Sequence, residues 1–223
     1  MRERPILLLD IYRRLLSCHG PQGWWPGESA FEVVVGAILT QATAWSNVER
    51  AIANLQAAGA LSPAGLYDLG EERLAELVRP SGYFNQKARK LRAVLAVLWQ
   101  EYGGDLERLW SLPAGELRER LLVIHGVGPE TADSICLYAA GKPSFVVDAY
   151  TRRVFSRLGL VAEAATYDQM RGLFMENLPA EAPLFNEFHA LVVKQGKDVC
   201  RKRAPRCGDC CLVDCCGQAV VND

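Results

Sequence analysis

Four cysteines in the C-terminal part of the chain are spaced so that their sulfur atoms could bind one metal centre. Their spacing is Cys-x6-Cys-x2-Cys-x5-Cys, over 17 residues of a 223-residue chain. Soft thiolates select zinc or iron–sulfur clusters. Zinc ribbons usually pair two Cys-x2-Cys knuckles. This segment has one knuckle, which favours a cubane [4Fe-4S] cluster over zinc. The predicted ligands are Cys200, Cys207, Cys210 and Cys216.

The remaining four cysteines do not belong to this spacing. Cys211 and Cys215 lie within the same segment, and either could replace a neighbour as ligand or could be an unligated thiol. Cys18 and Cys136 lie on expected helices and are interpreted as small core residues. We find no secretion signal and no apolar stretch of membrane-spanning length. We therefore expect a cytoplasmic chain whose cysteines stay reduced.

A glycine turn is the second chemical signal. After Ile124 a helix ends, Gly126 and Gly128 permit a tight turn, and Pro129 opens a new helix. Glycines let backbone amides approach a phosphate without interference from a Cβ atom, and a helix N-terminus adds partial positive charge. The turn suits a phosphate grip that ignores base sequence. On its own it is equally a corner between two helices.

A carboxylate, Asp148, stands 20 residues after Gly128, at the start of the next expected helix. Such a group can stabilise an oxocarbenium-like sugar and activate a water molecule, or it can be a plain N-cap. Between residues 194 and 206, six basic side chains outnumber the single Asp198, a local charge of +5 in a chain of net charge −1. That patch either binds phosphate or is a solvated basic face.

The elements that must position these groups are expected to be helices. Apolar residues recur at helical spacing through 85–102, and Ser62-Pro63 marks a helix start. We find no alternating strand pattern, and residues 144–147 are interpreted as a loop that enters a helix. Half of all residues are apolar, as in globular proteins. Three capping boxes are expected, at Ser29–Glu32, Ser46–Glu49 and Thr166–Gln169.

Together, the glycine turn, Asp148 and the cysteine spacing resemble the helix-hairpin-helix DNA glycosylase superfamily, and within it the endonuclease III family, through nearly the whole chain. Residues 31–41 are similar to the family's first barrel helix, which ends in Gln41, the residue that fills the gap left by an extruded base. The resemblance implies an all-α fold of two helical lobes. The lobes are a six-helix barrel at 30–142, with the helix-hairpin-helix at about 113–140, and an iron–sulfur lobe made of 1–29 and 143–223, with the cluster loop at 200–216.

The resemblance also implies a function. The protein would be a monomeric, nucleoid-associated DNA glycosylase of base excision repair, acting on double-stranded DNA that contains a damaged base. Asp148 matches the catalytic aspartate, and the hairpin carbonyls can hold a monovalent cation. Part of the cluster loop would face the phosphate backbone. Its basic residues are Lys202, Arg203 and Arg206.

One residue departs from the pattern of the bifunctional members of this family. Glu130 takes the place of the lysine that attacks the sugar through a Schiff base. A carboxylate cannot form an imine, so we expect a monofunctional glycosylase with weak or absent AP lyase activity. Glu130 could instead contact the flipped base.

Aromatic residues are candidates for the base pocket. The motif that they form resembles that of the 3-methyladenine glycosylases of the family, and it consists of Trp24, Trp25, Pro26 and Trp45. It favours an alkylated purine as the substrate base, held by stacking and cation–π attraction. They could equally be core. The alternatives are an oxidised-pyrimidine glycosylase with residual lyase activity and a non-catalytic iron–sulfur protein that binds DNA structure. We assign no role to His189, which lies on an apolar helix face.

Overall fold

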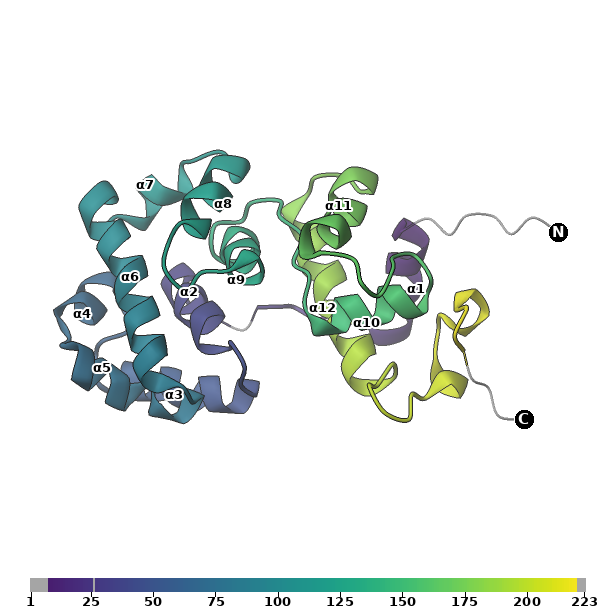
Figure 1. Ribbon diagram of the computed structural model, residues 1–223, viewed down its shortest axis with the longest axis horizontal. Helices are drawn as coiled ribbons and strands as arrows, with labels where there is room; N and C mark the ends of the chain where they lie inside the picture. The colour runs from purple at the N-terminus through teal and green to yellow at the C-terminus, as the bar shows by residue number, and fades with distance from the viewer. Residues whose placement is uncertain (1–7, 26, 220–223) are drawn as a thin grey trace. The chain divides into compact units, whose positions relative to one another are not determined.

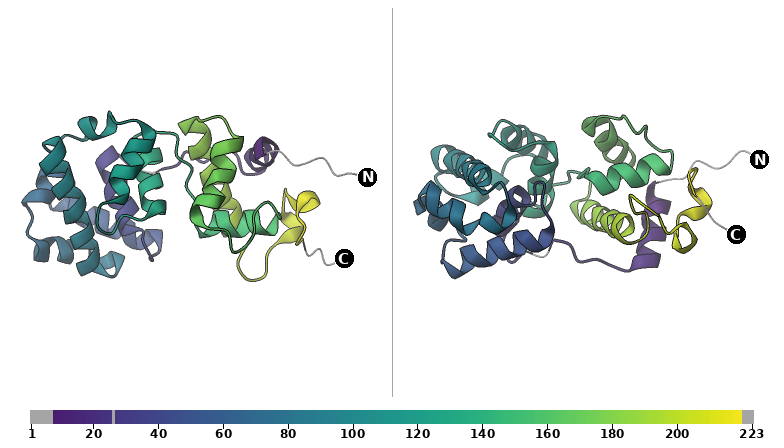
Figure 2. Two further views of the ribbon diagram at one scale, coloured as in Figure 1. Left: turned by 45° about the horizontal axis from the view of Figure 1, so that its top comes forward. Right: turned by 60° about the horizontal axis from the view of Figure 1, so that its bottom comes forward.

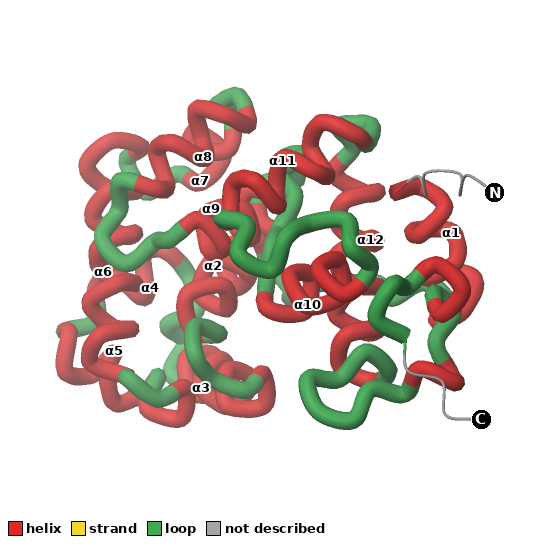
Figure 3. The backbone as a smooth tube through the Cα atoms, turned by 45° about the vertical axis from the view of Figure 1, so that its right-hand side comes forward, coloured by secondary structure: helices red, strands yellow, loops and turns green. Residues whose placement is uncertain are grey.

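The computed structural model describes residues 8–25 and 27–219. Over these residues the regular structure is helical and contains no strand (Figure 3), which confirms the expected all-α class. The chain divides into two compact units. We call Pro26–Lys142 the hairpin unit, and Met1–Trp25 together with Pro143–Asp223 the cysteine unit. Within the described ranges, no helix combines the length and apolar character that crossing a bilayer requires.

The hairpin unit is built around its first helix. Its elements are α2 (Ala30–Leu39), α3 (Trp45–Ala57), α4 (Pro63–Asp68), α5 (Glu71–Leu77), a 3-10 turn (Arg79–Ser81), α6 (Phe84–Tyr102), α7 (Leu106–Trp110), α8 (Ala114–Leu122), α9 (Pro129–Ser134) and a π turn (Ile135–Ala139). All residues of α2 from Phe31 to Leu39 are buried. A helix that is apolar on every side must be covered on every side, and α3, α6, α9 and the π turn pack against α2 (Figure 1).

Helix α6 confirms the periodicity seen in the sequence. Its predicted apolar face is buried, and the helix ends at Gly103, whose φ of 66° is the left-handed conformation common after helix C-termini. The buried positions on this face include Ala88, Leu91, Val94, Leu95 and Leu98.

The cysteine unit contains α1 (Leu8–His19), α10 (Ala149–Arg157), α11 (Tyr167–Asn177), α12 (Ala182–Asp198) and two 3-10 turns (Cys207–Asp209 and Val213–Cys215). Helix α12 packs against both α10 and α1 (Figures 1 and 2). The core is aromatic: the rings of Phe145 and Phe174 stack with centroids 3.7 Å apart, and Phe185 and Phe188 meet Phe145 edge-on. Phe145 lies in the extended segment before α10, so this core fixes the approach to α10.

Most helix starts follow their sequence signals. Thr166 and Gln169 form a complete capping box, and Ser62 caps α4 just before Pro63. Ser29 Oγ accepts a hydrogen bond from the amide of Glu32 at 3.1 Å. The expected loop at residues 144–147 is also confirmed, since no helix or strand is formed there.

Two expectations are wrong. Ser46 is not an N-cap, because α3 begins at Trp45 and Ser46 lies inside the helix, and the Glu49 carboxylate accepts from Trp45 Nε1 at 3.0 Å. Cys18 is not a core residue: it lies exposed on the last turn of α1. Cys136 is fully buried, as expected.

Candidate functional site

Asp148 is held at the start of α10 by backbone and core. The segment before it is pinned by Phe145, Val146 and Val147, all buried. Asp148 is the N-cap of α10, and its Oδ1 accepts a hydrogen bond from the amide of Thr151 at 2.7 Å. The side chain is 16% exposed, so solvent reaches it while one oxygen is fixed. The N-cap and the candidate catalytic carboxylate are therefore the same group.

His189 faces this carboxylate from α12. Its Nε2 lies 3.7 Å from Asp148 Oδ2, and its side chain is buried. Burial lowers the pKa of His189, and the nearby Asp148 opposes that shift without overcoming it. The imidazole is thus kept neutral at physiological pH and adds no positive charge beside the carboxylate. No role for His189 follows from the sequence, where its only signal is a titratable group at a core position of a helix.

The glycine turn joins α8 to α9 inside the hairpin unit. Gly126 has a φ of +83°, and an added Cβ would lie 2.2 Å from Lys90 Cγ. Gly128 is different: it is exposed, its φ is −90°, and it precedes the first residue of α9. A Cβ at Gly128 would meet no atom within 4 Å. The backbone of the turn requires glycine at position 126, whereas the space beside Gly128 is empty and a side chain would fit there.

Gln41, which follows α2, is tied to this turn. Its Nε2 donates to the Gly126 carbonyl at 3.1 Å and to Thr131 Oγ1 at 2.9 Å. Its Oε1 accepts from Lys90 Nζ at 2.5 Å. A cavity of about 220 Å³ beside Gln41 is also lined by Lys87 and Lys90. In the sequence, Gln41 and the turn are separate features, and the structure joins them in one network.

Glu130 lies exposed in the first turn of α9, two residues after Gly128. Negative charge is favourable at this end of a helix because the terminal amides carry partial positive charge. The structure thus has an exposed carboxylate at the position where a lysine would be expected in a bifunctional member of the family.

The four predicted cysteine ligands converge. All of them line one cavity of about 210 Å³ in the cysteine unit. Two side chains donate to their sulfur atoms: Arg157 Nη1 to Cys200 Sγ at 3.3 Å and Gln195 Nε2 to Cys210 Sγ at 3.0 Å. Such donors stabilise negative charge on sulfur. The converging residues are Cys200, Cys207, Cys210 and Cys216.

The two neighbouring cysteines take other directions. Cys215 Sγ donates to the Leu212 carbonyl at 3.1 Å. Cys211 lies beside Cys18, and burial together with that contact raises the pKa of the Cys211 thiol to about 12. Among the described residues, three possible ligand atoms lie within 4.8 Å of one another at Cys18, His19 and Cys211. Within the described residues, no three of the four thiols that line the cavity lie within 4.8 Å of one another.

Helix α10 connects Asp148 to the cysteine loop, residues 200–216. From the middle of α10, Arg153 donates to the carbonyls of Cys200 at 2.8 Å and Gly196 at 2.7 Å. Arg157 donates to the carbonyl of Arg201 at 2.7 Å. The arginines that follow Asp148 in the sequence therefore hold the backbone of the cysteine loop.

Basic side chains surround this connection. Lys202, Arg203 and Arg206 are exposed on the cysteine loop. A cavity of about 500 Å³ beside α10 is lined by Arg152, Arg153, Arg157 and Lys202, with Glu163 as its acidic member. Lys194 belongs less clearly to this basic surface, because it pairs with Asp198 at 2.8 Å.

The tryptophans fall in both units. Trp24 and Trp25, in the cysteine unit, are half-buried and meet edge to face with ring centroids 5.6 Å apart. Trp45 begins α3 in the hairpin unit and packs against its core. Pro26 lies outside the described residues. A pocket formed jointly by these residues stays a prediction.

The chain is similar in sequence to known DNA repair proteins. Residues 35–180 match the HhH-GPD superfamily base excision DNA repair proteins. MJ1434 of Methanocaldococcus jannaschii, whose name assigns it provisionally to the DNA repair glycosylases, is 46% identical over 211 residues, 94% of this chain and 96% of its own.

Solved structures agree with the family match. The H. pylori 3-methyladenine DNA glycosylase MagIII, bound to 1,N6-ethenoadenine, has a TM-score of 0.75 at 27% identity, covering 86% of this chain and 98% of that one. A trapped covalent complex of endonuclease III with DNA has a TM-score of 0.80 at 23% identity, covering 95% of this chain and 93% of that one.

Over the described residues, a helical fold with a glycine hairpin, an N-capping aspartate and a cysteine loop is typical of a DNA repair protein of the helix-hairpin-helix class. The chain belongs to the HhH-GPD superfamily of base excision DNA repair proteins, and within it to the endonuclease III-like DNA glycosylases.

Proposed function

We propose that this protein is a monofunctional glycosylase that hydrolyses the N-glycosidic bond of a damaged base by means of Asp148. The observation that carries the proposal is Glu130, an exposed carboxylate in the first turn of α9. Without an amine at this position, the sugar cannot be captured there as an imine. Water is then the nucleophile, and the product is an intact strand with an abasic site.

Asp148 suits this reaction because its two oxygens have different surroundings. Oδ1 is anchored by the Thr151 amide at 2.7 Å, which fixes the orientation of the carboxylate. Oδ2 faces the neutral His189 at 3.7 Å. A charged, oriented carboxylate stabilises the positive charge that develops on the sugar, and it can accept a proton from the attacking water.

DNA would be held by groups that do not read its sequence. The open space at Gly128 lets the amides at the start of α9 approach a phosphate. The exposed Lys202, Arg203 and Arg206 add positive charge on the cysteine loop. Gln41, bonded to the hairpin at Gly126, would enter the duplex as a base leaves it.

The cavity thiols fit a [4Fe-4S] cluster. They line one cavity and receive donors from Arg157 and Gln195. A tetrahedral zinc site, with Zn–S bonds of about 2.3 Å, would hold its sulfur atoms within about 4 Å of one another, whereas among the described residues no three of these four thiols lie within 4.8 Å of one another. When bound, the cluster supplies bonds that stiffen a segment with little core of its own. Its ligands would be Cys200, Cys207, Cys210 and Cys216.

For the substrate we favour an alkylated purine. The support is the pair of tryptophans at 24 and 25, the tryptophan at 45, and the similarity to MagIII, which was solved with 1,N6-ethenoadenine. Stacking on aromatic faces contributes roughly 1–3 kcal/mol per base, and a cationic purine gains cation–π attraction. The second candidate is an oxidised pyrimidine, favoured by the similarity to endonuclease III.

A panel of duplexes tests the proposal. Each duplex carries one alkylated purine or one oxidised pyrimidine, and each reaction is read with and without hot alkali. We expect release of the alkylated purine and strand breaks only after alkali. Breaks without alkali would overturn the monofunctional assignment. Binding of DNA without release of any base would favour a non-catalytic DNA-binding protein.

A further inference from the structure

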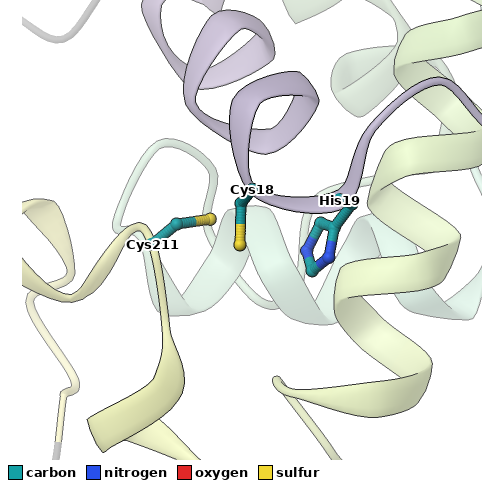
Figure 4. Close-up of side chains that lie close together, drawn as sticks. All are labelled: Cys18, His19 and Cys211. Carbon is teal, nitrogen blue, oxygen red and sulfur yellow. The ribbon is translucent and has the colours of Figure 1, made fainter.

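A second cluster of metal-binding side chains lies in the cysteine unit, apart from the four-cysteine cavity. Cys18 and His19 end helix α1, and Cys211 comes from the cysteine loop. One ligand atom from each lies within 4.8 Å of the other two. Figure 4 shows the two sulfur atoms side by side with the imidazole next to Cys18. The function proposed above uses none of these residues.

The imidazole is prepared for a ligand by its neighbour on α12. Gln195 Nε2 donates to Cys210 Sγ at 3.0 Å, so its Oε1, 2.8 Å from His19 Nε2, must be an acceptor. His19 Nε2 therefore carries the proton and donates it to Gln195. The tautomer that results leaves the lone pair on Nδ1, free to bind a metal. Metal-binding histidines are typically oriented by such a hydrogen bond from the other ring nitrogen.

The two segments that supply the ligands are joined independently of any metal. Arg14, on α1, donates to both carboxylate oxygens of Asp214 at 2.7 and 2.8 Å. Leu212, next to Cys211, is buried. The Arg14–Asp214 pair holds α1 against the cysteine loop, and the three ligand atoms already lie close together without an ion.

We infer that Cys18, His19 and Cys211 bind one zinc ion, with a fourth position open to solvent beside the exposed Cys18. A site with two thiolates and one imidazole binds zinc in preference to magnesium or calcium, which take oxygen ligands. Binding converts both thiols to thiolates, and two protons pass to the solvent. The site is separate from the proposed cluster, with which it shares the Gln195 bridge.

The experiment uses the full-length protein with its iron loaded, under anaerobic and reducing conditions. Zinc alone is titrated in competition with a chromophoric chelator, while iron and zinc are counted by mass spectrometry. We expect one zinc per chain with iron and visible absorption unchanged. The zinc absorption edge should report two sulfur neighbours at about 2.3 Å and one nitrogen at about 2.0–2.1 Å.

Variants distinguish this site from adventitious binding. Cys18→Ser and His19→Asn change residues at the end of α1, and each should weaken zinc binding more than about 100-fold, beyond the usual effect of losing an outer-shell partner. Cys215→Ser, in the same loop as Cys211, is the matched control and should keep one zinc. Normal iron content in each variant reports that the loop is folded.

Three results would overturn the inference. The first is equal zinc affinity in Cys18→Ser and the unchanged protein. The second is zinc uptake matched by loss of iron, which would place the ion in the four-cysteine cavity. The third is a Cys18–Cys211 disulfide, found by alkylation and peptide mass spectrometry in protein that takes up no zinc after reduction.

Discussion

His189 Nε2 lies 3.7 Å from Asp148 Oδ2, across the packed pair of helices α12 and α10. Because burial lowers the pKa of His189, the imidazole does not neutralise the carboxylate. The contact is made by residues 41 positions apart, and it defines the surroundings of the group on which the proposed chemistry depends.

Asp148→Asn should separate chemistry from structure. Asparagine is as good an N-cap as aspartate, so the hydrogen bond with the Thr151 amide and the melting temperature should be kept. The charge that stabilises the sugar is lost, and base release under single-turnover conditions should fall about 100- to 10,000-fold. DNA binding, measured by fluorescence anisotropy, should stay within a few-fold. An Asn variant that releases base at the normal rate would remove Asp148 from the mechanism.

Glu130→Lys should introduce a covalent intermediate. The new amine stands in the first turn of α9, and borohydride should trap an adduct with damaged DNA that the unchanged protein does not form. A cation at this helix end should also reduce the unfolding free energy by about 0.3–1 kcal/mol. Glu130→Gln removes the same charge without adding an amine. If the Gln variant is trapped as well, another lysine is the nucleophile.

The two glycines of the hairpin should respond differently to alanine. Gly126→Ala forces a left-handed residue and a contact with Lys90, and it should lower the unfolding free energy by at least about 1–2 kcal/mol. Gly128→Ala meets open space and should change stability by less than about 0.5 kcal/mol. Its added Cβ stands where a phosphate would approach, so DNA binding should weaken. Denaturant unfolding and binding isotherms of both variants check this; equal loss of stability would contradict it.

Iron content should depend on the cavity thiols alone. Cys207→Ser removes a residue that lines the cavity, and the purified variant should lose its iron and its visible absorption. Cys215→Ser changes a thiol that contacts the Leu212 carbonyl instead, and it should retain both. Full iron in Cys207→Ser, or its loss in Cys215→Ser, would change the assignment of the ligands.

Lys87 should make stability depend on alkaline pH. It is buried, its ammonium donates to the carbonyls of Leu39 and Ser81, and burial, with help from Lys90, lowers its pKa from 10.5 to about 8. Between these two pH values the unfolded chain binds a proton that the folded protein does not, so the unfolding free energy rises with pH.

This increase in unfolding free energy should be measured against the Lys87→Met variant, whose side chain cannot titrate. The unchanged protein should become more stable relative to this variant by up to about 3 kcal/mol between pH 8 and pH 10.5. Below pH 8 the cost of burying the charge is present in full. A difference that stays constant with pH would mean that the ammonium is not desolvated.

Local patterns predicted the helices and the separate parts of the site. Turn chemistry placed α9 after Gly128, capping placed Asp148 at the start of α10, and spacing selected the four thiols that share a cavity. Each of these signals lies within a short stretch of sequence. The start of α3 was predicted wrongly. In a capping box the Glu49 carboxylate would accept from the amide of Ser46, but it accepts from Trp45 Nε1 instead.

Contacts between distant segments could not be predicted in this way. The bond from Gln41 to Gly126 spans 85 residues, and the contact of His189 with Asp148 has no local pattern. Cys18 was assigned to the core because a thiol on a helix is usually buried. Its partner, Cys211, comes from the other end of the sequence. Such pairs follow from packing, which a single sequence does not display.

The pairing of Arg14 with Asp214, 200 residues away, has a consequence for biosynthesis. All of Pro26–Lys142 is translated between the two segments that this pair unites, and it can fold while the ribosome is still at work. Ile11 and Leu15 are fully buried in the folded protein, but their apolar side chains stay exposed on the nascent chain until α12 has been translated. The proposed cluster could be inserted only after Cys216 has been translated, and a chain stalled before α12 would leave α1 open to chaperones and proteases.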